Sequence, residues 1–260
     1  MDICGATFVI LLFNFDRMVS STTENTMATS SKFEGYPDKL KMTGKQLQEI
    51  PEGHISVRIL DLAYNHLSYL PMNGFKNKSF KNITSLDLHQ NRINNVSSSA
   101  FFGLKILTEV DISSNQITAL DSYTFEYNRK LKKLDLSNNR IQFTKSEVFL
   151  VSTSINTLIL SNNNIDQLYE LTFVGLKYLT NLVLDDNCLN TIHSNSLKPL
   201  IGIEFLSLAQ TNVVSLKTTM FTRIPRILNI ESTPLAKKFD PPLTRIKKSQ
   251  VATLLEAESN

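Results

Sequence analysis

Four aspartates recur at nearly constant spacing, and they are the side chains whose type and interval best suit chemistry. Asp61, Asp87, Asp111 and Asp135, called the acidic column below, are separated by 26, 24 and 24 residues. If each occupies the same position of a repeated coil, their carboxylates lie about 5 Å apart, the spacing of adjacent strands. Like charges this close repel, so we expect the acidic column to attract cations or a basic partner surface. The alternative is that each carboxylate bonds to nearby backbone or faces water.

The other titratable and nucleophilic side chains form no catalytic constellation. The four histidines have no metal-ligand spacing, although His66 and His89 fall near Asp61 and Asp87. The serines that follow the acidic column are ordinary repeat positions, and the eight glycines form no phosphate-binding loop. We therefore expect no enzyme activity, no bound metal and no cofactor.

The aspartates belong to a longer apolar frame that is repeated along the chain. The frame reads L-x-x-L-x-L-x-x-N-x-L, and one copy consists of Leu131, Leu134, Leu136, Asn139 and Ile141. Regular self-similarity of this kind indicates a solenoid. The L-x-L core alternates inward and outward as a short strand does, so the leucines of neighbouring coils stack while the aspartates point outward.

A polar residue occupies the asparagine position of the frame in each coil. The column consists of Asn65, Asn91, Asn115, Asn139, Asn163, Asn187, Thr211 and Thr233. An amide has both a donor and an acceptor, so we predict a buried ladder in which each asparagine serves the turning backbone of two neighbouring coils. The two threonines offer only a hydroxyl group, which predicts a weaker ladder toward the C-terminal end.

A second column lies ten residues after the polar one and is almost entirely phenylalanine. Its members are Phe75, Phe101, Phe125, Phe149, Phe173, Leu197 and Phe221. We predict that these side chains fill the wide convex side of each coil as a stack of rings. They are expected core residues and not a platform for nucleic-acid bases, because base stacking needs exposed rings beside basic grooves.

Repeats of 24 residues with this phenylalanine resemble the typical class of leucine-rich repeats over about residues 40–235. The resemblance implies an α/β-type solenoid, a leucine-rich-repeat horseshoe of about eight coils plus terminal caps, with a parallel β-sheet on the concave face. That class occurs mainly in extracellular proteins such as Toll-like receptors. Segments such as LDLSNNRI and LVLDDN are similar to secreted insect proteins of innate immunity and adhesion. This chain lacks the cysteine motif and long coiled coil of the immune members, so their covalent complexes are not implied.

The later coils place apolar residues where the earlier coils place aspartate. We expect Ile159, Val183, Phe205 and Ile227, called the apolar patch below, to point outward on the concave face with Asp185 at the rim. Grouped exposed apolar side chains mark interaction sites on soluble proteins. The apolar patch is therefore the predicted partner site. The alternative is that the C-terminal segment folds over it.

Both ends of the chain differ from the repeats. Residues 3–15 form an apolar run that is too short to span a bilayer but has the length of a signal-peptide core, although the start is not basic. We expect a cleaved signal, with an uncleaved anchor and a non-targeting start as alternatives. The predicted segments are a signal peptide over 1–21, a disordered Ser/Thr-rich lead over 22–39, a cap half-repeat over 40–53, the solenoid over 54–235 and a C-terminal cap with a short helix over 236–260.

Cysteine and sequon usage bear on the cellular compartment. Cys4 lies in the predicted signal, so Cys188 is alone in the expected mature chain and is either a free thiol or an intermolecular disulfide site. Sequons at Asn77, Asn82 and Asn95 predict glycosylation in a secreted chain.

These patterns predict a secreted, extracellular solenoid without catalytic function that binds a cell-surface or secreted protein in recognition, adhesion or innate immunity. A net charge of +3 and the lack of a groove-reading motif predict no nucleic-acid partner. We expect no integral membrane segment in the mature chain, and the oligomeric state is left open. One alternative is an intracellular scaffold or regulatory subunit, favoured by the missing disulfides. Another is a self-associating component of the extracellular matrix.

Overall fold

The computed structural model describes residues 37–239 and 245–247. The chain divides into two units, Met1–Glu34 and Gly35–Asn260, and every described residue belongs to the second. The predicted signal peptide, Cys4, most of the predicted lead and the predicted C-terminal helix lie outside the described residues.

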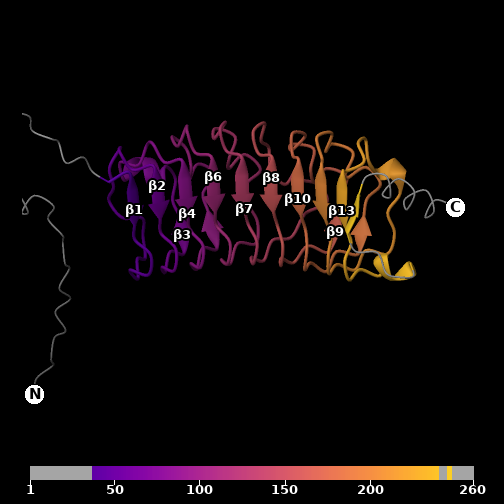
Figure 1. Cartoon of the computed structure of the whole chain (residues 1–260). Coiled ribbons are helices and arrows are strands. Elements are labelled where there is room, and N and C mark those ends of the chain that lie inside the picture. The colour runs from indigo at the N-terminus through magenta and orange to yellow at the C-terminus, as the bar shows by residue number, and fades with distance from the viewer. Residues whose placement is uncertain (1–36, 240–244, 248–260) are drawn as a thin grey trace, which may run out of the picture. The chain divides into compact units, whose positions relative to one another are not determined.

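A ten-stranded sheet runs along the solenoid, with its strands side by side in chain order (Figure 1). Its strands are β1 (Lys39–Lys41), β2 (Ile59–Asp61), β4 (Ser85–Asp87), β6 (Glu109–Asp111), β7 (Lys133–Asp135), β8 (Thr157–Ile159), β10 (Asn181–Val183), β12 (Phe205–Ser207), β13 (Ile227–Asn229) and β14 (Arg245–Lys247). All neighbours from β1 to β13 are parallel, and only β14 pairs antiparallel. The predicted leucine-rich-repeat solenoid with a parallel sheet on its concave face is confirmed.

The remaining elements are short and lie outside this sheet. Two pairs of two-residue strands are parallel: β3 (Tyr69–Leu70) with β5 (Asn95–Val96), and β9 (Gln167–Leu168) with β11 (Thr191–Ile192). The helical turns are α1 (Gly74–Asn77), η2 (Thr218–Met220) and η3 (Ala236–Lys238). Among the described residues, no helix has the length and apolar character needed to cross a membrane.

One column of the core consists of inward side chains, one from the centre of each strand. In β7, Leu134 is fully buried between the outward residues Lys133 and Asp135. Burying one such leucine contributes roughly 2 kcal/mol. Because a single coil cannot enclose its apolar side chains by itself, this burial depends on the coils on either side.

The predicted amide ladder is present in the first six coils. Asn139 donates from Nδ2 to the carbonyl oxygens of Ile112 in the preceding coil and Leu136 in its own coil, both at 3.1 Å. Its Oδ1 accepts the backbone N–H of Ile117 in the preceding coil at 3.0 Å. The other five asparagines repeat this arrangement, so each amide joins two coils.

The ladder weakens where threonine replaces asparagine, as predicted. The Thr211 hydroxyl donates to Leu208 O, and the Thr233 hydroxyl donates to Ile230 O, both at 2.6 Å and both within one coil. A hydroxyl is too short to reach the preceding coil in the way that the amide does. Side-chain bonding across coils at this position therefore ends at Asn187.

The predicted stack of phenylalanine rings is only partly correct. Phe75, Phe101 and Phe125 stack with centroid distances of 5.9 and 4.7 Å. Beyond them Phe143, which lies outside the phenylalanine column, packs edge-to-face against Phe149 and Phe173 at 4.9 and 5.8 Å. The parallel stack therefore changes to perpendicular contacts where this extra ring joins the core.

The two ends of the sheet are closed differently. At the N-terminal end β1 adds a parallel strand, and Asn65 Oδ1 accepts the backbone N–H groups of Lys45 and Leu47 at 2.9 and 3.0 Å. At the C-terminal end β14 adds an antiparallel strand, and its central residue Ile246 is 2% exposed. An antiparallel strand is a cap that the repeat frame did not predict.

Candidate functional site

The strands pair so that residues at the same position of neighbouring repeats lie side by side, and they form two outward columns on the concave face. The third residues of the strands are paired in the order Asp61, Asp87, Asp111, Asp135, Ile159, Val183, Ser207 and Asn229. The first residues are paired in the order Ile59, Ser85, Glu109, Lys133, Thr157, Asn181, Phe205 and Ile227. The acidic column therefore occupies four adjacent strands, as its spacing predicted.

Each carboxylate of the acidic column also holds the turn that follows its strand. Oδ1 accepts the backbone N–H two residues later, at 2.9 Å in both Asp111 and Asp135 and at 3.1 Å in both Asp61 and Asp87. Local bonds of this kind are common for aspartate beside turns. The alternative of bonding to nearby backbone is therefore observed, and the half-buried carboxylates still face the concave surface.

Lys133 forms an ion pair with a glutamate of the neighbouring strand and lies near two carboxylates of the acidic column. Lys133 Nζ donates to Glu109 Oε1 at 2.7 Å from the neighbouring strand. The pKa of Lys133 is raised chiefly by this hydrogen bond, and further by the nearby carboxylates of Asp135 and Asp111, against the lowering effect of partial burial. The third and fourth coils therefore carry part of their own counter-charge.

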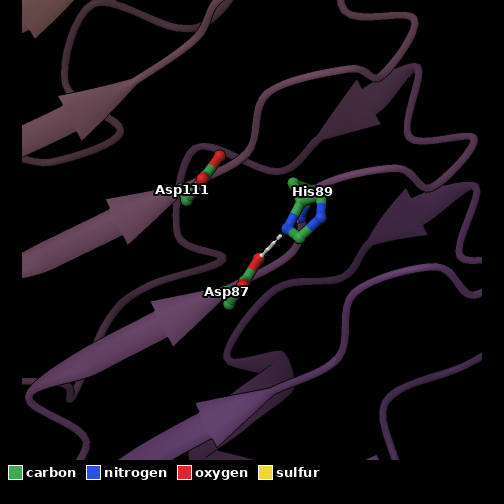
Figure 2. A group of neighbouring side chains, drawn as sticks. All are labelled: Asp87, His89 and Asp111. Carbon is green, nitrogen blue, oxygen red and sulfur yellow. Dashed lines mark hydrogen bonds and ion pairs between the residues drawn. The ribbon is translucent and has the colours of Figure 1, made fainter. Parts of the chain in front are cut away.

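His89, which the sequence placed near Asp87, joins the acidic column in a cluster that also includes Asp111. His89 Nδ1 lies 2.6 Å from Asp87 Oδ1, and one ligand atom from each of Asp87, His89 and Asp111 lies within 4.8 Å of the others (Figure 2). The ring of Tyr64 packs edge-on against His89 with a centroid distance of 4.8 Å. In the sequence, an Asp-x-His segment lies one repeat before another aspartate. The strand register places this second aspartate beside the segment.

The cluster offers imidazole nitrogen and carboxylate oxygen, which are ligand types for divalent cations. All three side chains are half-buried, and His89 already pairs with Asp87. Partly exposed acidic groups are commonly solvated by water alone. The cluster therefore has ligand types that suit a cation, but its geometry does not by itself define a metal site.

The apolar patch spans β8, β10, β12 and β13. Ile159 pairs with Val183 in one column, and Phe205 pairs with Ile227 in the other. All four side chains are half-buried. Strand β14 extends the sheet beside β13, with Lys247 paired to Ile227, so this part of the C-terminal segment lies alongside the patch in the sheet.

Asp185 lies next to the patch and is tied to the next coil. Its Oδ1 accepts the backbone N–H of Ala209 at 2.8 Å. The pKa of Asp185 is raised above its usual value, chiefly by burial and further by the negative charges of Asp186 and Glu231. Hydrogen bonds from Ser207 and Ala209 partly oppose this shift. Asp185, which the sequence placed at the rim of the apolar patch, is thus half-buried and bonded to the next coil.

The sequon asparagines and the cysteine lie outside this face. Asn77 ends α1, Asn95 begins β5, and Asn82 lies in the segment before β4; all three are exposed. Cys188 is also exposed and is a free thiol in this chain.

Comparison with known proteins agrees with this architecture. The family model described as "Leucine rich repeat" matches residues 55–117, 81–141 and 153–214, which together exceed half of the chain. No curated protein matches the sequence significantly.

Two solved structures share the fold. The chain is similar to TLR13 in a TLR13–ssRNA13 complex, with 24% identity and a TM-score of 0.51 over 68% of this chain and 29% of that one. It is also similar to the leucine-rich repeat domain of APL1B, with 19% identity and a TM-score of 0.55 over 75% of this chain and 64% of that one. The chain thus spans less than two thirds of either. The repeat frame, the parallel sheet and the matching family model together show that this chain belongs to the leucine-rich-repeat family.

Proposed function

We propose that this chain is a non-catalytic protein-binding solenoid whose apolar patch makes the main contact with a protein partner. The observation that carries the proposal is the grouping of Ile159, Val183, Phe205 and Ile227 at outward positions of four adjacent strands. Apolar side chains at the centre of an interface and polar groups at its rim are typical of protein recognition. Completing the burial of one half-buried valine or phenylalanine contributes roughly 1 kcal/mol.

The acidic column supplies the second part of the proposed recognition surface. Four carboxylates in adjacent strands favour a partner that brings lysine or arginine to the first coils while apolar side chains meet the later ones. The same charges disfavour a phosphate backbone at this position. A protein ligand therefore suits the concave face better than a nucleic acid.

Secretion is part of the proposal. It is supported by the apolar run over 3–15 and by the exposed sequon residues Asn77, Asn82 and Asn95. The resemblance to receptor and insect repeat proteins favours recognition, adhesion or innate immunity. An intracellular scaffold would use the same concave face. A self-associating matrix component would use the exposed thiol of Cys188 or an end of the sheet.

Expression from the native start codon in insect cells tests the compartment. We expect protein in the medium that begins near Thr22 and migrates faster after glycosidase treatment. Unprocessed, sugar-free protein confined to the cytosol would instead favour the scaffold. A non-reducing gel of the same sample separates a monomeric binder from a dimer linked through Cys188.

A matched pair of double variants tests the binding surface. The test variant is Val183→Asp with Phe205→Asp, and the control is Val174→Asp with Tyr178→Asp, which changes side chains that are 47% and 52% exposed outside the sheet. Binding of the labelled proteins to intact insect cells is measured by flow cytometry. We expect the first pair to lose at least about tenfold in affinity because buried carboxylates are left unpaired, and the control pair to bind as the wild type does. Unchanged binding by a folded Val183→Asp, Phe205→Asp variant would refute the assignment.

A further inference from the structure

A hollow of about 840 Å³ lies away from the sheet, on the first three coils. Its lining includes Lys81, Lys105 and Arg129, which are spaced by 24 residues and each precede a strand of the sheet by four residues. The spacing places one cation at the same position of three consecutive coils. We call this site the basic hollow.

The cations of the basic hollow have no acidic partners among the described residues. Lys81, Lys105 and Arg129 are exposed, and the lining contains no acidic side chain. Other lysines of these coils are paired, as in Lys78 with Glu52 and Lys133 with Glu109, both at 2.7 Å. Three unpaired positive charges in adjacent coils repel one another, and an anion bound between them relieves that repulsion.

Two aromatic rings and a fourth cation also line the basic hollow. Phe102 and Tyr127 meet edge-to-face with a centroid distance of 5.4 Å, and Lys76 Nζ lies 5.1 Å from the centroid of Phe102. Gly103 makes room for this lysine, because a Cβ at Gly103 would lie 3.0 Å from Lys76 Cδ. The ammonium group lies over the ring of Phe102, which is 38% exposed, while Tyr127 is 58% exposed beside the row of cations.

We propose that the basic hollow binds a sulfated polysaccharide. A row of cations repeated along the solenoid axis matches a linear chain that carries sulfate groups at intervals better than it matches one compact anion. The volume lies within the range of ligand sites. A single-stranded nucleic acid needs open ring faces for its bases, and Lys76 lies over one of the two rings. Sugar rings can pack through their C–H groups against the exposed Tyr127 and leave the Lys76–Phe102 pair in place.

The sequon at Asn82 provides an independent prediction because Asn82 also lines the basic hollow. An N-linked sugar chain at Asn82 would fill or cover the space that the polysaccharide needs. If Asn82 is glycosylated in the expressed protein, Asn82→Gln should increase polysaccharide affinity, whereas Asn95→Gln, outside the lining, should leave it unchanged.

The test measures heparin binding by isothermal titration at several salt concentrations. The test variant is Lys81→Gln, Lys105→Gln and Arg129→Gln, and the charge-matched control is Lys145→Gln, Lys198→Gln and Arg226→Gln, which removes three exposed cations from later coils. We expect the test variant to lose at least about tenfold in affinity and roughly three units of the slope of log affinity against log salt, by the counterion-release argument developed for nucleic acids. The control should stay within about twofold of the wild type.

A Tyr127 variant and a comparison with an oligothymidylate test the ligand class, and heparin binding itself tests the site. Tyr127→Ala should weaken heparin binding several-fold with the salt slope unchanged, because it removes a contact to the sugar and no charge. Absence of heparin binding by the wild type, or equal losses in the two triple variants, would overturn the site. Tighter binding of an oligothymidylate of matched charge than of heparin would overturn the choice of a polysaccharide.

Discussion

The first four coils and the last four share one inward frame but present opposite chemistry on the concave face. In the first four, the acidic column lies at the third position of each strand, and each carboxylate holds its own turn. In the last four, Ile159 and Val183 continue that column, and Phe205 and Ile227 enter the adjacent one. Inward residues are fixed by the stacking of coils, whereas outward residues are free to serve recognition. We propose that the change from charged to apolar surface marks the part of the solenoid that contacts a partner.

The two halves also differ in how their coils are joined. Amides link each coil to its predecessor up to Asn187, whereas Thr211 and Thr233 bond only within their own coils. The acidic surface thus lies entirely on coils with full ladder bonding, and part of the apolar patch lies on coils without it. We infer that the last two coils unfold more readily than the first four.

The largest expected effect on stability comes from removing a ladder amide. Asn139→Ala leaves the buried Ile117 N–H without its acceptor and removes one of the two amide donors to the Ile112 carbonyl. We expect a loss of about 3 kcal/mol in the free energy of unfolding. Thr211→Val removes one bond within a single coil and should cost about 1 kcal/mol. Urea unfolding followed by circular dichroism measures both, and equal losses would remove the distinction between the two halves.

The reverse change should strengthen the C-terminal coils. An asparagine at position 211 would offer Oδ1 to the backbone N–H of Leu189, by analogy with the bond from Ile165 N–H to Asn187 Oδ1 one coil earlier. We expect Thr211→Asn to raise the free energy of unfolding by about 1 kcal/mol. Hydrogen exchange should show the gain as slower exchange near Leu189 and Asn212. A destabilised variant would mean that these coils lie too close for an amide.

The smallest expected effect is the pH dependence of Asp185. Its pKa is raised in the folded state, chiefly by burial, so the folded protein holds this proton to higher pH than the unfolded chain does. Ionisation of Asp185 therefore disfavours folding as the pH rises from about 4, the ordinary pKa of aspartate, through the raised pKa. The free energy of unfolding of the wild type should fall relative to that of Asp185→Asn over this range. A wild type whose free energy of unfolding rises with pH relative to that of Asp185→Asn would contradict the sign.

The fold could be predicted from the sequence because every repeat carries the same pattern of apolar residues with one polar position. The leucines, the asparagine ladder and the weaker bonding at Thr211 all follow from side-chain period and hydrogen-bonding capacity. The break in the ring stack was not predictable, because Phe143 enters from outside the repeated column. The strand β14 was missed for a similar reason, since its sequence carries no copy of the repeat frame.

The surface sites were harder to predict than the fold. The concave columns follow from the spacing, since the register preserves it from strand to strand. The proximity of His89 to Asp87 follows from the sequence, whereas the addition of Asp111 to this pair requires the register. The cations Lys81, Lys105 and Arg129 form no tract in the sequence, and they become neighbours because one solenoid turn separates them. Charges spaced at the repeat length can therefore form a surface patch although they are far apart in the sequence.

Site-specific photo-crosslinking most directly tests the claim that the apolar half of the concave face is the main contact. A photoreactive phenylalanine analogue would replace Phe205 in the apolar patch, Asp87 in the acidic column or Tyr178 outside the sheet, and each protein would be irradiated on intact insect cells. We predict a strong protein adduct from position 205, a weaker adduct of the same mass shift from position 87 and none from position 178. An adduct from position 178 alone, or equal adducts from all three positions, would contradict recognition through the concave face.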